Sequence, residues 1–267
     1  MPLFQLILIA LIQGITEFLP VSSSGHLILL PGLTGLADQG QMIDVAVHVG
    51  TLGAVVLYFW RDVQTGLAGL VTLVQGRTDT PGARLALNLI IATIPVILAG
   101  AVLHLTGLDN MMRSVAVIGW AMLLFGLLLY WADRRATQDK HAEDWTPMGA
   151  VKLGLWQAVA LIPGTSRSGI TITGALTMGY TREDAARLSM LMSIPTILAS
   201  AVLLGTDAYR VTDPAVLRDA TIAAGMSFAA ALAALALMMR LLRSVSFTPY
   251  VIYRVILGVV LLGYAYT

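Results

Sequence analysis

Two short segments of the sequence place hydroxylated, small and ionisable residues inside otherwise apolar stretches. They are LPVSSSGH at 19–26, called the first tip below, and IPGTSRSG at 162–169, called the second tip. In each tip a proline interrupts the apolar stretch, because proline has no helical N–H to donate. The Ser, Thr and Gly residues that follow favour a helix cap, and the free N–H groups at a helix start bind anions. Both tips therefore predict an anion site.

A carboxylate and an amide precede the first tip. Gln13 and Glu17 are four residues apart, so a helix places both side chains on one face. Such a pair suits a hard divalent cation such as Mg²⁺, which takes one or two protein oxygens together with substrate phosphate oxygens. A buried glutamate that hydrogen-bonds a neighbouring helix explains the pair equally well. Taken alone, the pair leaves a metal site and a structural contact equally open.

The first tip also carries a histidine. His26 follows Ser22 and Ser23 by about one helical turn, which is close enough to exchange a proton with a hydroxyl group or a water molecule. The alternative is that the serines only cap the helix and that His26 is a buried histidine with satisfied hydrogen bonds. The tip thus predicts either an acid–base site or a well-capped helix start.

The second tip adds a guanidinium group. Arg167 offers two parallel donors to phosphate oxygens and keeps its charge when desolvated, and Thr171 lies one turn further into the helix. The alternative is a salt bridge between Arg167 and Glu17. We favour phosphate binding, because one ion pair does not require two tips rich in Gly and Ser. Together, the two tips and the preceding carboxylate contain the groups that phosphoryl transfer needs.

The composition determines the solvent in which these groups work. With 57% hydrophobic residues, 12% charged residues and a mean hydropathy of +0.82, the chain is predicted to be a polytopic, all-α integral membrane protein. The absence of cysteine excludes disulfides, thiolate metal sites and cysteine nucleophiles. A net charge of +1 gives no reason to expect a nucleic-acid partner. We expect no cleaved signal peptide, because the first basic residue is Arg61.

Hydropathy and the two tips predict the architecture. Six full transmembrane helices are expected, at 43–60, 86–105, 113–132, 186–205, 217–239 and 249–266. The interrupted stretches at 3–34 and 150–179 are predicted to be re-entrant helical hairpins rather than kinked spans. A hairpin returns to its own side of the membrane, whereas three spans do not. The single membrane domain 1–267 should therefore be an inverted-topology repeat, with halves at about 1–132 and 150–267 and both tips near the midplane.

Basic residues predict the orientation. One face of this scheme holds eleven of them in the expected loops 61–85, 133–152, 180–187 and 240–248, including the connecting loop 133–149. The opposite face holds only Arg113, Arg210 and Arg218. The positive-inside rule assigns the first face to the cytoplasm, and both termini to the outside.

At these motifs the sequence resembles the undecaprenyl-pyrophosphate phosphatase family of bacteria, also called bacitracin-resistance proteins. The resemblance covers nearly the whole chain. The family's glutamate-rich first motif, which accepts glutamine at its first position, matches the segment from Gln13 to Glu17 and runs into the first tip. The second tip is also present, as are stretches similar to the family's HVGTLGAVVLYFWRD, SMLMSIP and FTPYVIYR. Gln13 departs from a two-carboxylate motif, which implies a lower metal affinity.

The resemblance implies an enzyme of the bacterial inner membrane. Its reaction would be removal of the terminal phosphate from a C55 polyprenyl pyrophosphate, which returns the monophosphate carrier to peptidoglycan synthesis and confers bacitracin resistance. Bacitracin would compete for the lipid substrate rather than bind the protein. The family's active site is thought to open to the periplasmic side, and its members form dimers. The cofactor would be a divalent cation, Mg²⁺ or alternatively Ca²⁺.

Specific residues are expected in the site. The predicted catalytic residues are Glu17, Ser23, His26 and Arg167. The predicted metal ligands are Gln13 and Glu17. The phosphates are expected to meet Ser22, Ser24, Gly25, Thr165, Ser166, Arg167, Ser168 and Thr171. The nucleophile is Ser23, His26 or an activated water, and the sequence does not distinguish them.

Two rival functions remain from other classes. A polyprenyl-phosphate transporter or flippase is the serious alternative, because inverted repeats with broken helices are typical of secondary transporters. A purely structural scaffold does not explain ionisable residues in apolar half-helices. Asp44, His48 and Arg254 are weaker site candidates, since packing, snorkelling or helix–helix hydrogen bonds explain them at least as well. His141 is assigned to a solvated cytoplasmic connection.

Overall fold

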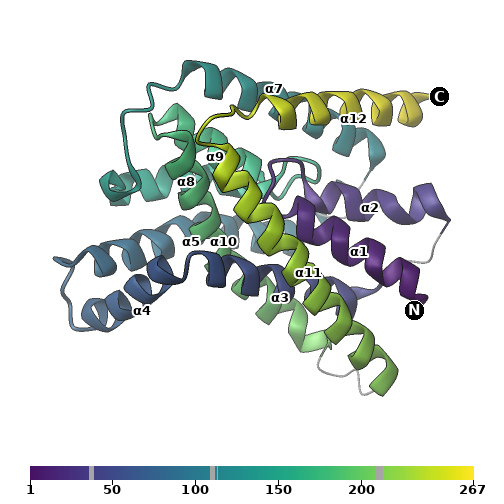
Figure 1. Cartoon of the computed structure of the whole chain (residues 1–267), viewed down its shortest axis with the longest axis horizontal. Helices are drawn as coiled ribbons and strands as arrows, with labels where there is room; N and C mark the ends of the chain where they lie inside the picture. The colour runs from purple at the N-terminus through teal and green to yellow at the C-terminus, as the bar shows by residue number, and fades with distance from the viewer. Residues whose placement is uncertain (36–38, 109–111, 113, 209–212) are drawn as a thin grey trace.

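The computed structural model describes residues 1–35, 39–108, 112, 114–208 and 213–267, and every regular element in these residues is a helix (Figure 1). The helices are α1 Leu3–Thr16, α2 Ser23–Thr34, α3 Gln41–Tyr58, α4 Trp60–Val74, α5 Pro81–Thr106, α7 Val115–Arg135, the short η1 Ala142–Asp144, α8 Pro147–Val159, α9 Arg167–Thr177, α10 Arg182–Ala208, α11 Pro214–Leu241 and α12 Thr248–Tyr266. The all-α prediction is confirmed.

Six helices in the described ranges are long and apolar enough to cross a membrane: α3, α5, α7, α10, α11 and α12. They confirm the six predicted spans and a multi-pass membrane protein. Their ends differ from the predicted ones where caps extend a helix into polar sequence. Thr80, for example, accepts a hydrogen bond from the Ala83 N–H, so α5 begins at Pro81 rather than at residue 86. Arg113 and Arg210, used for the orientation, lie outside the described residues.

One part of the prediction was wrong. Residues 61–85 were expected to form a loop, but most of them belong to α4 and to the start of α5. The exposed apolar residues Leu67, Leu70 and Val71 lie at helical spacing on α4. Gly69 of α4 and Gly82 of α5 let the two backbones approach closely, and α4 packs along α5. The prediction counted only the basic residues of this segment, so it missed the amphipathic pattern of α4.

The two interrupted stretches form paired helices. α1 packs against α2, and α8 packs against α9, with a tip between the helices of each pair. α1 also packs on α11, and α8 packs on α5, so each pair leans on a long span. The approach is close, because a Cβ atom at Gly14 would lie 2.7 Å from the Ser227 carbonyl oxygen and one at Gly154 would lie 2.6 Å from that of Ala92. Glycine at both positions lets the backbones touch.

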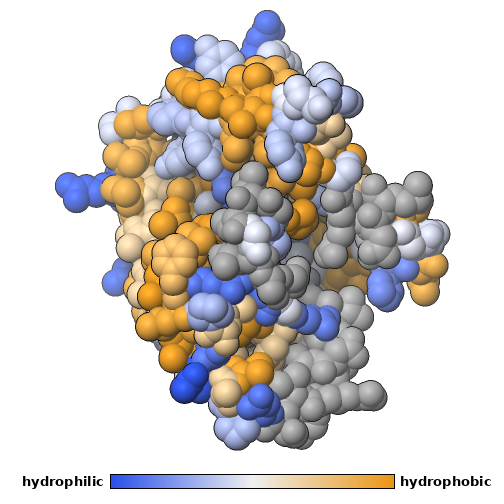
Figure 2. All heavy atoms as spheres, turned by 90° about the vertical axis from the view of Figure 1, so that its right-hand side faces the viewer, coloured by the Kyte–Doolittle hydropathy of each residue, from blue (hydrophilic) through white to orange (hydrophobic). Residues whose placement is uncertain are grey.

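The two chain termini lie at one end of the molecule, and the connection between α7 and α8 lies at the other (Figure 1). Large apolar side chains stay exposed on the outer surface of the long helices, with Leu105 at 84% exposure. Figure 2 shows apolar residues in broad areas on the face that carries the termini, with hydrophilic residues interspersed. The exposed apolar side chains along the long helices suit a lipid environment. Polar residues gather instead in the interior, around the two tips.

Candidate active site

Each tip contains a serine with an unusual backbone. Ser22 and Ser166 have φ of 73° and 71°, in the left-handed region that side chains other than glycine rarely adopt. Each is the N-cap of the following helix, and its hydroxyl group accepts the N–H of Gly25 or Gly169, at 3.3 and 3.1 Å. Strained backbone of this kind gathers at functional sites. The serines therefore cap α2 and α9, as the sequence predicted.

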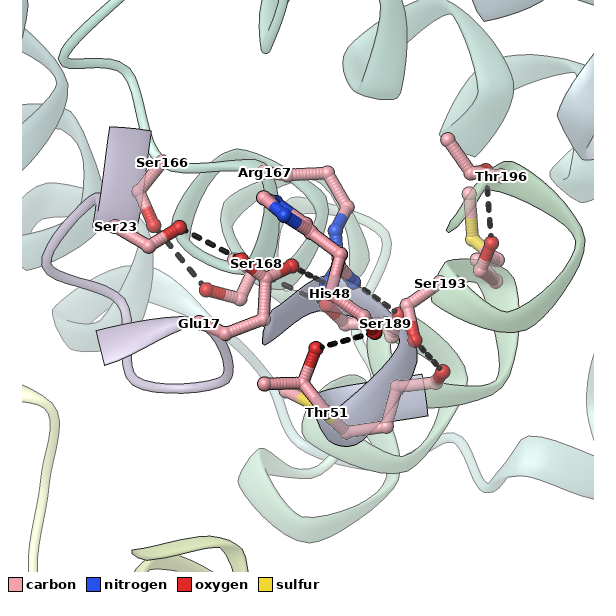
Figure 3. A network of polar contacts seen from close by, with 12 residues as sticks. Glu17, Ser23, His48, Thr51, Ser166, Arg167, Ser168, Ser189, Ser193 and Thr196 are labelled. Atoms are coloured by element: carbon pink, nitrogen blue, oxygen red, sulfur yellow. Dashed lines mark hydrogen bonds and ion pairs between the residues drawn. The ribbon is translucent and has the colours of Figure 1, made fainter. Parts of the chain in front are cut away.

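The Glu17 carboxylate joins the two tips. Its Oε1 accepts a hydrogen bond from the Arg167 guanidinium at 2.8 Å. Its Oε2 accepts the Ser23 hydroxyl at 2.6 Å and the Gln13 amide at 3.0 Å. Figure 3 shows Glu17, Ser23 and Arg167 facing one another. The Glu17–Arg167 ion pair, which the sequence offered as the alternative to phosphate binding, is present, and the same carboxylate accepts the Ser23 hydroxyl group.

The second tip is held by further hydroxyl contacts. Ser168 donates a hydrogen bond to the Leu19 carbonyl at 3.0 Å, which links the second tip directly to the first. The Thr171 hydroxyl lies 2.6 Å from that of Ser189, and Arg167 donates to the Ser189 carbonyl at 3.2 Å. Ser189 was not predicted, because it lies within the apolar run of α10. It fixes the arginine and the threonine relative to each other.

A buried arginine lies behind the two tips. Arg254 of α12 is fully buried, and its guanidinium donates to the carbonyls of Pro20 at 3.4 Å and Gly164 at 3.1 Å, one from each tip. It also bonds the carbonyls of Ala121 and Met122 on α7. The sequence ranked Arg254 as a weak candidate. Its position makes it the contact that holds both tips against α7 and α12.

His26 turns toward α12 rather than toward the serine hydroxyls. Its Nδ1 lies 2.6 Å from the Ser22 carbonyl oxygen, and its Nε2 lies 2.5 Å from the Tyr253 hydroxyl group. The two rings stack at 5.7 Å between centroids. Among the hydrogen bonds of the described residues, none joins the His26 ring to Ser23 or Glu17. A catalytic role for His26 therefore stays a prediction.

A cavity of about 670 Å³ opens beside the Glu17–Arg167 pair, between α2, α3 and α10. It is lined by Glu17, Ser24, Leu27, Ile28, Gln39, Gln41, Asp44, Val45, His48, Arg167, Thr196, Ile197, Ser200 and Ala201. Its wall combines apolar side chains with a few charged and hydroxylated ones, which is the usual make-up of a ligand site. Asp44 and His48, ranked as weak candidates, thus belong to the same cavity as the Glu17–Arg167 pair.

Three other residues that the sequence singled out do not line this cavity. Gln13 and Thr165 are fully buried, and within the described residues neither Gln13 Oε1 nor Thr165 Oγ1 has a hydrogen-bond partner. His141 lies in the α7–α8 connection, where a hydrogen bond to Asp184 at 2.9 Å raises its pKa. Its exposed position agrees with a solvated connection.

Glu17 and the neighbouring Gln13 can accept a hard cation. Gln13 Oε1 is a buried oxygen without a partner, and it lies on the same side chain that donates to the Glu17 carboxylate. The described residues contain no group of three or more His, Asp or Glu that would hold a metal ion without a substrate. Mg²⁺ commonly needs only one or two protein oxygens when phosphate supplies the others. Gln13 and Glu17 therefore fit a metal that arrives with a phosphorylated ligand.

Comparison with known proteins places the chain in a family. Residues 6–260 match the family described as "Bacitracin resistance protein BacA". The chain belongs to this family. It is 73% identical to a Ruegeria pomeroyi protein named undecaprenyl-diphosphatase, over 100% of both chains. It is 47% identical to undecaprenyl-diphosphatase 1 of Rhodospirillum rubrum, over 100% of this chain and 96% of the relative. The family match covers both tips, five of the six spans and the first 13 residues of α12.

Proposed function

We propose that the chain acts as an undecaprenyl-diphosphatase by binding the lipid's pyrophosphate in the cavity between α2, α3 and α10. The observation that carries this proposal is that Glu17 and Arg167, which line the cavity, bond each other, and that Glu17 also accepts the Ser23 hydroxyl group. These side chains supply a hydroxyl nucleophile, a base and a phosphate-binding cation. The products are the C55 monophosphate, which returns to peptidoglycan synthesis, and inorganic phosphate.

Ser23 is the nucleophile that the contacts favour. Its proton points to Glu17, and the carboxylate is oriented by Gln13 and Arg167. Attack of Ser23 Oγ on the terminal phosphorus passes the proton to Glu17, and the bridging P–O bond breaks with its electron pair on the monophosphate. Water then cleaves the phosphoserine. A water molecule activated by Glu17 gives the same products without the intermediate, and trapping of a labelled phosphoenzyme distinguishes the two routes.

His26 remains the other acid–base candidate. For His26 to act as a base toward Ser23 or as a nucleophile, its Nε2 has to leave the Tyr253 hydroxyl group. Arg167, the start of α9 and the hydroxyl groups of both tips would meanwhile hold the phosphates. Ser22 and Ser166 position the N–H groups of α2 and α9 for this contact.

We further propose that Gln13 and Glu17 hold Mg²⁺, with Ca²⁺ as the alternative. The unpartnered Gln13 Oε1 supports this assignment. The bound cation would neutralise charge on the phosphates as the bridging bond breaks. In its presence Arg167 would be shared between Glu17 and the phosphate, and this sharing would leave the carboxylate available to the metal and to Ser23.

The proposed topology has both tips near the membrane midplane, in an inverted repeat. Three features support it: the matching caps at Ser22 and Ser166, the packing of α1 on α11 and of α8 on α5, and the position of both termini at one end of the molecule (Figure 1). With the basic end in the cytoplasm, the termini and the cavity mouth would face the periplasm. By family resemblance we propose a homodimer, and we propose that bacitracin competes for the lipid substrate.

The test is phosphate release from undecaprenyl pyrophosphate by the detergent-purified protein, with and without a chelator. We expect metal-dependent release by the wild type and loss of release in Glu17→Ala and Arg167→Ala. Activity that persists in both variants would remove the cavity from the reaction. The transporter alternative is tested by measuring the flux of labelled monophosphate carrier in vesicles. It predicts that Ser23→Ala leaves this flux intact.

A further inference from the structure

Two histidines near the tips share the same local geometry. Nδ1 of His26 lies 2.6 Å from the Ser22 carbonyl oxygen, and Nδ1 of His48 lies 2.7 Å from that of Asp44. In both cases the carbonyl belongs to the residue four positions earlier in the chain. A carbonyl oxygen only accepts hydrogen bonds, so Nδ1 carries the proton in both rings. The neutral form of each ring therefore has its lone pair on Nε2.

The two rings differ in what meets Nε2. Nε2 of His26 accepts the Tyr253 hydroxyl group at 2.5 Å, so this lone pair is occupied. Nε2 of His48 has no hydrogen bond within the described part of the chain, and the residue lines the cavity together with Glu17 and Arg167. Figure 3 shows His48 beside this pair. Of these two histidines, His48 is the one that offers an available nitrogen to the cavity.

Packing alone does not explain this arrangement. Nε2 of His48 is not one of the buried polar atoms without a partner in the described residues, so it is open to the cavity although His48 comes from α3, one of the six spans. An apolar residue at position 48 would extend the apolar part of the wall that includes Val45 and Ile197, and it would need no polar partner. The ring is instead fixed through Nδ1, and this leaves Nε2 directed by the helix backbone rather than by a neighbouring side chain.

We propose that His48 Nε2 binds the pyrophosphate of the substrate, as a further catalytic residue beside Arg167. A protonated phosphate oxygen donates to the lone pair, or the ring takes up that proton and donates it back to the charged oxygen; one hydrogen bond and one proton are shared in either state. This inference rests on the proposed use of the cavity by the lipid's pyrophosphate. It assigns to α3 a contact with substrate that neither tip supplies.

Two substitutions of His48 test the roles of its two ring nitrogens separately. His48→Asn keeps an amide N–H near the position of Nδ1, able to donate to the Asp44 carbonyl, and it removes any group at Nε2. His48→Gln places its amide nitrogen near the position of Nε2. We expect kcat/KM for undecaprenyl pyrophosphate to fall by about 10- to 100-fold in His48→Asn, the loss typical of a hydrogen bond to a charged group. In His48→Gln most of the activity should remain.

The controls make either result decisive. His141→Asn, on the cytoplasmic connection, should match the wild type, and melting temperatures in detergent report folding. If His48→Asn does not fold, His48→Met replaces it, because methionine fills the space without a nitrogen. Wild-type kcat/KM in the folded variant lacking Nε2 would overturn the assignment while an inactive Arg167→Ala upheld the cavity. Full activity of Arg167→Ala would instead overturn the site itself.

Discussion

The first and second tips are capped alike and carry different chemistry. Both begin a helix with a serine at positive φ, and each serine hydroxyl accepts a glycine N–H. Aligning the two capping serines matches Gln13 with Gln157, Glu17 with Leu161, Ser23 with Arg167 and His26 with Ile170. The proton-transfer groups thus belong to the first half, and the guanidinium belongs to the second.

This difference shows how the same serine-capped helix start can carry two different chemical groups. A helix start attracts an anion whatever its sequence, so two facing starts create a phosphate site before any side chain is chosen. In the proposed reaction the side chain after each cap decides the role: Ser23 would supply the hydroxyl group that reacts, and Arg167 would supply the cation that binds phosphate. Because the groups are divided, neither half holds the complete Glu17–Ser23–Arg167 contact.

The largest effect on kcat is expected at Glu17, and comparing Glu17 with its aligned counterpart Leu161 tests this division. Glu17→Gln keeps the shape and removes the charge that accepts the Ser23 proton, so kcat should fall by about 10³-fold. Leu161→Gln, the matched change in the second half, should stay within about threefold of the wild type. Phosphate release by both folded variants is the measurement. Equal losses in the two variants would mean that the halves contribute similar chemistry.

The next effect concerns the contact that both tips share. Arg254→Lys retains the charge but cannot reach the carbonyls of both tips and of α7 together. Misplacement of the tips by about 1 Å should lower kcat by roughly 10²-fold with a smaller change in KM. A lower melting temperature is also expected, because buried carbonyls lose their donor. Unchanged kcat with a lower melting temperature would limit Arg254 to a structural role.

A smaller effect is expected from the aligned buried glutamines Gln13 and Gln157. Gln13→Glu restores a second carboxylate beside Glu17, and we expect half-maximal activation at an about tenfold lower Mg²⁺ concentration. Gln157→Glu makes the same change in the second half, where the aligned neighbour is Leu161, and it should leave metal activation unchanged. Metal titrations of phosphate release compare the two. A shift in both variants, or in neither, would count against metal binding by Gln13.

The sequence predicted the parts of this site that are local. Hydropathy located the six spans, proline followed by serines located both tips, and the spacing of Gln13 and Glu17 placed them on one side of α1, where they hydrogen-bond each other. Each of these features depends on a few neighbouring residues, and so periodicity and capping chemistry are enough to find them.

Contacts between distant helices were not predictable in the same way. Tyr253 and Arg254 come from α12, and Ser189 comes from α10, yet they hydrogen-bond residues of the tips. No spacing rule links residues so far apart in the chain, and each lies in an apolar run where packing was the simpler interpretation. His48 was underrated for the same reason, because its cavity is formed only when α3 meets α2 and α10.

The smallest expected effect sharpens what the first tip's histidine adds. The second tip has Ile170 at the position aligned with His26, so the contact between His26 and Tyr253 of α12 has no counterpart at the second tip. Tyr253→Phe removes only the hydroxyl donor to Nε2, and the loss of one neutral hydrogen bond should change kcat/KM by about 3- to 10-fold.

The direction of this change in kcat/KM is informative. A decrease means that Tyr253 holds His26 in its working position, whereas an increase means that Tyr253 restrains a histidine that has to turn toward Ser23. Phosphate release with His26→Ala as the reference distinguishes these cases, because in that background Tyr253→Phe should have no further effect. An additional loss in the double variant would show that Tyr253 acts independently of the histidine.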